Sequence, residues 1–155
     1  MLNIKVETIM TQNVIALQPG DKLITALEEM QSKRIRHIPI VNKKGEFVGL
    51  ISHRDLIAAS TSFLGEEYSK KRQNILAVTP VEKLMHKRVR TTTPDADIRE
   101  VAIQMRKNKW GCLPVLKGKI LAGIITATDF LTLSINLLSF HEQLQKNLKS
   151  NYKRS

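Results

Sequence analysis

Cysteine, aromatic residues and long apolar runs are scarce in this chain of 155 residues. The single cysteine, Cys112, excludes an intrachain disulfide and makes a reducing compartment the default. No apolar run reaches the roughly 20 residues that a membrane-spanning helix needs. The first ten residues include Lys5 and Glu7 and lack the apolar stretch of a signal peptide. We therefore expect a cytoplasmic protein without a membrane span.

Acidic residues are also few, since 14 Asp and Glu stand against 25 Lys and Arg, and the net charge is +11. The basic excess falls after residue 60, in several clusters and in the C-terminal tail. Such a surface attracts anions such as nucleotides, nucleic acid or acidic lipid, or it simply keeps the protein solvated. The tail offers one aromatic side chain, Tyr152, for stacking on bases, so nucleic acid is not the expected partner.

The chain repeats itself with an offset of 75 residues. The segment Val6–Met10 corresponds to Val81–Met85, and the agreement continues for about fifty residues. Further pairs are Val14 and Val89, Pro19 and Pro94, Met30 and Met105, and Pro39 and Pro114; after a one-residue deletion come Gly49 and Gly123, Ile51 and Ile125, and Asp55 and Asp129. Two copies of one unit are predicted.

Each copy has the same predicted order of elements. A short strand and a Pro precede an amphipathic helix, whose apolar residues recur at i, i+3, i+4 and i+7 from Leu23 or Ile98. Residues 38–41 and 113–116 predict a strand, residues 47–51 and 120–125 a second one, and another helix begins at Ser52 or Thr126. The fold class is therefore α+β, with β-α-β-β-α in each copy. Because each half is too small to bury its apolar face alone, the halves should pack together.

Two segments lie outside the copies. Residues 61–79 form a linker whose polar part has Glu and Lys at i, i+4 spacing, which could support a helix. From Phe130 to Leu148 the leucines indicate an extended helix, followed by a basic tail. This helix could pack on the module, pair across a dimer or bind a partner.

The repeated motifs resemble tandem CBS domains, which are called a Bateman module. The strongest match is Gly49-Leu-Ile-Ser52-His-Arg-Asp55 with Gly123-Ile-Ile-Thr126-Ala-Thr-Asp129, which fits the Gly-h-x-Ser/Thr-x-x-Asp signature of that family. The resemblance implies one motif in residues 1–60, a second in residues 80–134, packing by a pseudo-two-fold axis, and residues 135–155 as the C-terminal helix and tail. It also implies a homodimer, and a stand-alone module that acts through an unknown effector protein.

The signature has a chemical rationale as a nucleotide site. Unpaired amides and the dipole at a helix start favour a phosphate, and the hydroxyl of Ser52 or Thr126 could add a hydrogen bond. A carboxylate such as Asp55 or Asp129 can accept bonds from both hydroxyls of a ribose. The resemblance implies these same roles and an adenine base between apolar strand residues. The alternative is a capping box, in which the two side chains satisfy the amides of the helix itself.

The two copies differ where a ligand would lie. The position that is often Thr in the first strand holds Thr91 in the second copy and Ala16 in the first. Before the strand Pro, Gly111-Cys112-Leu113 leaves room for adenine, whereas Arg36-His37-Ile38 could crowd the base or contact phosphate. Arg54 could add charge for a polyphosphate, or be an ordinary solvated residue. One ligand is expected to draw residues from both copies, in a combination that the sequence leaves open.

Other kinds of site fail on spacing. There is no P-loop and no G-x-G-x-x-G, and the histidines and Cys112 lack the spacing of metal ligands. No nucleophile with a base or pair of acids is evident, so we expect a regulatory module that is no enzyme and requires no cofactor. The candidate ligands are AMP, ADP, ATP, S-adenosylmethionine and a magnesium–nucleotide complex. The alternatives are a structural dimer with degenerate sites and a basic nucleic-acid-binding protein.

Overall fold

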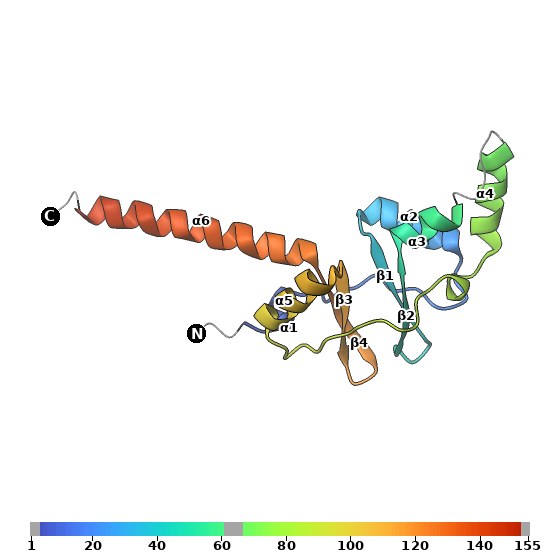
Figure 1. Cartoon of the computed structure of the whole chain (residues 1–155), viewed down its shortest axis with the longest axis horizontal. Coiled ribbons are helices and arrows are strands. Elements are labelled where there is room, and N and C mark those ends of the chain that lie inside the picture. Colours follow the sequence, from blue (N-terminus) through green and yellow to red (C-terminus); the bar gives the residue numbers. More distant parts are fainter. Residues whose placement is uncertain (1–3, 61–66, 153–155) are drawn as a thin grey trace.

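The computed structural model describes residues 4–60 and 67–152, and two halves of the same construction lie next to each other (Figure 1). The first half contains α2 (Leu23–Lys33), β1 (His37–Val41), β2 (Phe47–Ser52) and α3 (His53–Ser60), followed by α4 (Glu67–Val78). The second half repeats that order with α5 (Ile98–Asn108), β3 (Cys112–Lys117), β4 (Ile120–Thr126) and α6 (Ala127–Tyr152). A short leading turn precedes each half: α1 (Val6–Ile9) before the first and the 3-10 turn η1 (Val81–Lys83) before the second. The predicted α+β class with a C-terminal helix is confirmed.

Each half is built on an antiparallel hairpin, β1 with β2 and β3 with β4. The helices α2 and α5 pack on these hairpins through the positions that the helical spacing predicts. The buried residues are Leu23, Ala26 and Met30 in α2, and Ile98, Val101 and Met105 in α5. The two hairpins lie side by side in Figure 1, and Glu46, just before β2, forms an antiparallel bridge with Ile120 at the start of β4.

The short strand expected before each helix is reduced to one residue. Leu17 forms a parallel bridge with Ile40, and Thr92 forms one with Val115. The Leu17 amide donates to the carbonyl of Pro39 (3.1 Å) and the Val41 amide donates to the carbonyl of Leu17 (2.9 Å). Because Pro39 has no N–H, it cannot donate the next bond of a parallel ladder, and Pro114 ends the second bridge in the same way.

Each leading turn packs against the half that it does not precede: α1 against the second half and η1 against the first. The side chain of Val6 is fully buried in the core of the second half, whereas that of Val81 is fully buried in the core of the first. The backbone follows the same rule, because the Val6 amide donates to the carbonyl of Ala96 (2.9 Å) and the Val81 amide to that of Asp21 (2.7 Å). Each core is therefore completed by the other copy, as expected for halves that are too small to bury their apolar faces alone.

The signature glycines allow this exchange. An added Cβ on Gly123 would lie 2.7 Å from the carbonyl oxygen of Thr11 and 2.8 Å from the sulfur of Met10. An added Cβ on Gly49 would lie 2.7 Å from the sulfur of Met85. Only a residue without a side chain lets the segment after each leading turn approach the opposite hairpin so closely. The Met of each leading turn thus packs against the signature glycine of the other copy: Met10 against Gly123 and Met85 against Gly49.

The segments outside the copies are helical. Within the predicted linker, α4 packs against α2 and buries Leu76 in the first core, while residues 61–66 lie outside the described part. The predicted C-terminal helix starts earlier than Phe130, because α6 continues directly from the second signature motif at Ala127. It projects away from both hairpins in Figure 1 and exposes a set of apolar side chains, Leu131, Ile135, Leu137, Leu138, Phe140, Leu144 and Leu148. Among the described residues, no helix combines the length and apolar character required to span a membrane.

Candidate functional site

The Ser/Thr-x-x-Asp motifs stand at the starts of α3 and α6, where the carboxylate of each motif bonds back to its Ser or Thr. Oδ2 of Asp55 accepts bonds from the amide and the hydroxyl of Ser52, at 2.8 and 2.6 Å. Oδ2 of Asp129 accepts the equivalent bonds from Thr126, at 2.6 and 2.9 Å. Both hydroxyls therefore donate to the carboxylate. In the first copy the Asp55 amide also donates to the Ser52 hydroxyl (3.3 Å), which completes the capping box considered from the sequence; among the described hydrogen bonds, the second copy has only the carboxylate half of that box.

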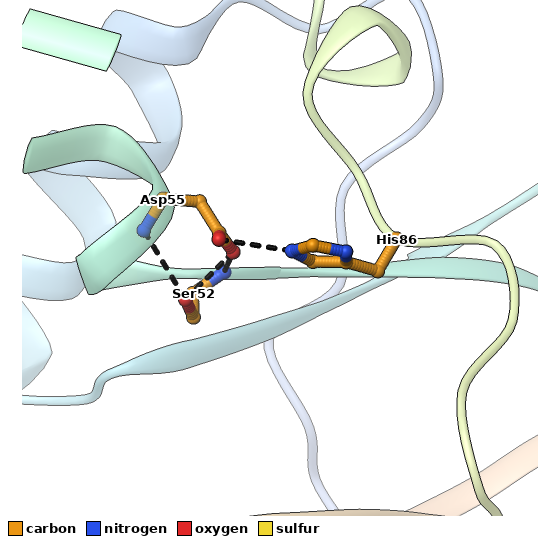
Figure 2. A network of polar contacts seen from close by, with 3 residues as sticks. All are labelled: Ser52, Asp55 and His86. Carbon is orange, nitrogen blue, oxygen red and sulfur yellow. Dashed lines mark hydrogen bonds and ion pairs between the residues drawn. The ribbon is translucent and has the colours of Figure 1, made fainter. Parts of the chain in front are cut away.

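The second oxygen of the carboxylate distinguishes the two motifs. Oδ1 of Asp55 accepts a bond from Nε2 of His86 at 2.9 Å, so both of its oxygens are engaged (Figure 2). Burial disfavours the Asp55 carboxylate, but the hydrogen bonds from Ser52 and His86 outweigh this and hold its pKa below the ordinary value. Within the described part of the chain, Oδ1 of Asp129 has no hydrogen-bond partner.

The first pocket lies between the first signature motif and the second copy. Ser52 and Asp55 form one wall, and residues 86–90 and 109–113 form the other. The cationic side chains of Arg88, Arg90 and Lys109 belong to this second wall. The cavity has a volume of about 340 Å³ and is open to solvent. Three Lys or Arg side chains against one Asp give the pocket an excess of positive charge, which attracts anions.

The second pocket is the counterpart of the first, with the roles of the copies reversed. Thr126 and Asp129 face residues 13–15 and 34–36 of the first copy. Arg34 and Arg36 supply the positive charge there, and the cavity is larger, about 720 Å³. Both volumes lie in the range of small-ligand sites, roughly 300 to 1,000 Å³. Each pocket combines the signature motif of one copy with residues of the other copy.

The predicted contact residues divide into three groups. Ser52, Asp55, His37, Cys112 and Leu113 line the first pocket, and Thr126, Asp129, Arg36 and His37 line the second. Thr91 lines a neighbouring hollow together with Arg90 and Leu113. Ala16, Ile38 and Arg54 line neither of the two pockets. Side chains alternate along β1, so His37 faces the pockets while Ile38 is buried in the core; Arg54 lies one residue before Asp55 and is exposed to solvent. The predicted ligand contacts of these three residues find no support in the pocket walls.

His37 and Gly111 belong to both pockets and lie where the pockets adjoin. The His37 ring packs so close to Gly111 that an added Cβ would lie 3.2 Å from its Cε1. Burial is the main reason why the pKa of His37 lies below its ordinary value, and Arg36 and Arg54 lower it further while Asp55 opposes them. At neutral pH the His37 ring, which both pockets share, is therefore largely uncharged.

Arg34 and Lys109 line the pockets but were not among the residues predicted from the sequence. They occupy equivalent positions after α2 and α5, and both have the left-handed backbone conformation, with φ of 54° and 56°. Glycine is the usual residue at such a helix end, because a side chain is strained there. The offset of 75 residues pairs Arg34 with Lys109, so a basic residue at this place in both copies was the available signal.

Cys112 is a buried free thiol at the wall of the first pocket. Burial raises the pKa of the Cys112 thiol to about 12, so the thiol is protonated at neutral pH. No three metal-ligating side chains gather anywhere in residues 4–60 or 67–152. The two pockets offer hydrogen-bonding groups and positive charge.

Comparison with known proteins places the two copies in one family. The model of the family described as CBS domain matches residues 6–62 and 81–136. A curated relative, protein MJ1225 of Methanocaldococcus jannaschii, is 29% identical over 148 residues, which cover 96% of this chain. The chain spans about half the length of that relative, because the match covers 49% of it.

Solved structures share the fold of the whole pair. A candidate acetoin utilization protein (AcuB) from Vibrio cholerae has a TM-score of 0.79 and 39% identity, and the match covers 92% of this chain and 99% of that one. The CBS domain pair of protein MJ0100, solved in complex with 5′-methylthioadenosine and S-adenosyl-L-methionine, has a TM-score of 0.68 and 26% identity over 84% of this chain and 98% of that one.

Proposed function

The chain belongs to the CBS-domain family, and from this premise we propose that it is a regulatory module that binds an adenine nucleotide or an adenosyl ligand in its two crossed pockets. AMP, ADP and ATP are the leading candidates, followed by S-adenosylmethionine and a magnesium–nucleotide complex. One observation carries the proposal. In each pocket, a carboxylate at a helix start faces basic side chains from the other copy.

The second pocket shows how these groups fit a nucleotide. Oδ1 of Asp129 is available to accept a bond from a ribose hydroxyl, while Oδ2 keeps its bonds to Thr126. The amides of Thr128 and Asp129 at the start of α6, together with Arg34 and Arg36, suit a phosphate, whereas the Ala127 amide already donates to the carbonyl of Gly111 (3.1 Å). Val14 and Ile15 offer apolar surface to a base. The Thr126 hydroxyl would have to leave the carboxylate to reach a phosphate, so we assign phosphate binding to the amides and the arginines.

Helix capping alone is a weaker explanation of the site. It accounts for the bonds between Ser52 and Asp55 and between Thr126 and Asp129. It gives no reason why Arg88, Arg90 and Lys109 line one pocket and Arg34 and Arg36 the other. Like charges brought together around a cavity repel one another unless an anion is bound there. Capping and ligand binding are therefore joint roles of the same carboxylates.

A ligand in either pocket would contact both halves of the module. Occupancy can then shift how the halves pack, and a partner that docks on the module would sense the shift. We propose that the output passes to an effector protein or through a homodimer in the cytoplasm, without catalysis by this module. The exposed apolar side chains of α6 support association with a second copy or an effector.

Isothermal titration tests this function. Protein freed of bound ligand is titrated with AMP, ADP, ATP and S-adenosylmethionine, and at least one should bind saturably. Asp129→Asn should lower the ligand affinity of the second pocket about 10-fold or more, because hydrogen bonds to a charged group contribute about 1.5–3 kcal/mol. Asp97→Asn is the matched control, since Asp97 caps α5 by accepting from the Arg99 amide (2.8 Å) and lines neither pocket. The absence of a binding signal with all four ligands would contradict the proposal and favour a structural dimer with degenerate sites.

A further inference from the structure

The two pockets differ at the residue that faces the signature carboxylate. In the first pocket this residue is His86; the equivalent residue 75 positions earlier, Thr11, lines the second pocket. Both are fixed by paired backbone bonds to the opposite hairpin. His86 exchanges bonds with Leu50 at 2.8 and 2.9 Å, and Thr11 exchanges bonds with Ile124 at 2.9 and 3.0 Å. The two side chains therefore start from equivalent places, and only the imidazole is long enough to bond the carboxylate.

The consequence for a ribose is direct. A carboxylate that already uses Oδ2 for its capping box has Oδ1 left for a sugar hydroxyl. Asp129 has that oxygen free among the described residues, whereas Oδ1 of Asp55 is occupied by His86 Nε2 at 2.9 Å (Figure 2). A ribose in the first pocket must therefore displace the imidazole from Asp55, and a ribose in the second has nothing to displace.

The displacement is feasible because of where the two side chains lie. The Asp55 side chain is 18% exposed and that of His86 is 64% exposed, so the imidazole can leave towards solvent without opening the core. Breaking a partly exposed, charge-assisted bond weakens binding but does not prevent it. The smaller cavity of the first pocket agrees with a ring lying against its carboxylate.

We propose that His86 is a latch on Asp55 that makes the two nucleotide sites unequal, so that the pocket of Asp129 fills first and the pocket of Asp55 fills only at higher ligand concentration. This inference rests on the proposed function. It adds a specificity-determining residue and an order of filling. The chain would then respond to ligand over two concentration ranges instead of one.

Single-pocket variants measure the latch directly, with AMP as the probe in isothermal titration. In an Asp129→Asn background, which leaves the first pocket, His86→Thr should tighten AMP binding roughly three- to tenfold, the equivalent of one partly exposed charge-assisted hydrogen bond. In an Asp55→Asn background, the reciprocal substitution Thr11→His should lower the AMP affinity of the second pocket by a similar factor. Unchanged or weaker binding in the His86→Thr variant would overturn the latch and make His86 an ordinary ligand contact.

The order of filling supplies a second readout. In NMR titrations of the otherwise unaltered chain, the amide signals of Thr126 and Asp129 should saturate at lower AMP concentration than those of Ser52 and Asp55. The gap should narrow in His86→Thr. Simultaneous saturation in the unaltered chain would overturn the latch alone. Absence of AMP binding to the unaltered chain and to every variant would overturn the latch together with AMP as the ligand of these pockets.

Discussion

Arg34 and Lys109 show, at the scale of single residues, a conflict between stability and binding. Each is the residue after a helix, in the left-handed conformation that glycine adopts most easily, and each lines a pocket. A non-glycine residue in that conformation costs about 1 kcal/mol. Strain of this kind concentrates at functional sites, where the side chain has a second role. We assign that role to the positive charge.

Arg34→Gly should separate the two effects. The free energy of unfolding should rise by roughly 0.5–1 kcal/mol, because glycine relieves the strain at φ 54°. Affinity for AMP at the second pocket should fall about three- to tenfold with the loss of the guanidinium. Urea denaturation and isothermal titration give the two values, and Lys109→Gly is the matched variant for the first pocket. A variant that is more stable and binds AMP equally well would contradict the assigned role.

Cys112 provides a test of burial at the first pocket. Because burial raises its pKa to about 12, the thiolate that reacts with disulfide reagents is scarce at pH 8. Labelling of the folded protein should be at least about 100-fold slower than labelling in urea, where a free cysteine titrates near pH 8.5. The folded rate should keep rising with pH from 7 to 10. A plateau near pH 9 would show that the thiol is accessible and has an ordinary pKa.

At the scale of elements, Gly49 within β2 and Gly123 within β4 control how the segments after α1 and η1 dock. Gly123→Ala would place a Cβ 2.7 Å from a backbone oxygen, which can move only if the Thr11 bridge shifts. Gly49→Ala meets the flexible end of Met85 first, with the His86 carbonyl oxygen at 3.1 Å. We therefore expect Gly123→Ala to disturb the structure more than Gly49→Ala.

Gly123→Ala should destabilise the protein by about 1–3 kcal/mol, as overpacking of a filled interior does, and Gly49→Ala should cost less. Gly20→Ala is the control, since no heavy atom lies within 4 Å of its added Cβ. The midpoint of urea unfolding measures all three variants. Equal stability of Gly123→Ala and Gly20→Ala would contradict the close docking of residues 10 and 11 on β4.

Local elements were predictable where local patterns determine them. The spacing of Leu23, Ala26 and Met30 matches the buried face of α2, because a helix with one apolar stripe has one way to bury it. The first strand was predicted longer than it is. The missing N–H of Pro39 limits the pairing with Leu17 to one residue. The helical character of residues 67–78 was left open, since its support comes from the packing of Leu76 against the first core.

At the scale of the whole molecule, the exchange of leading turns makes the two copies one unit. Val6 and Val81 each complete the core of the opposite half, and each pocket takes its walls from both copies. The repeat was visible in the sequence, but an offset of 75 residues fits either crossed or uncrossed packing. Long-range contacts such as Asp55 with His86 leave no local pattern, so the latch could not be predicted. The homodimer expected from the sequence stays a prediction.

The crossed origin of the pockets is the central claim, and an NMR titration of the labelled chain with AMP tests it most directly. We predict that amide signals of residues 13–15 and 34–36 shift together with those of residues 126–129, at one common affinity. The amides of residues 86–90 and 109–113 should shift together with those of Ser52 and Asp55 at higher concentration. Shifts in which each signature motif responds with the leading segment of its own copy would contradict the account, as would the absence of any shift.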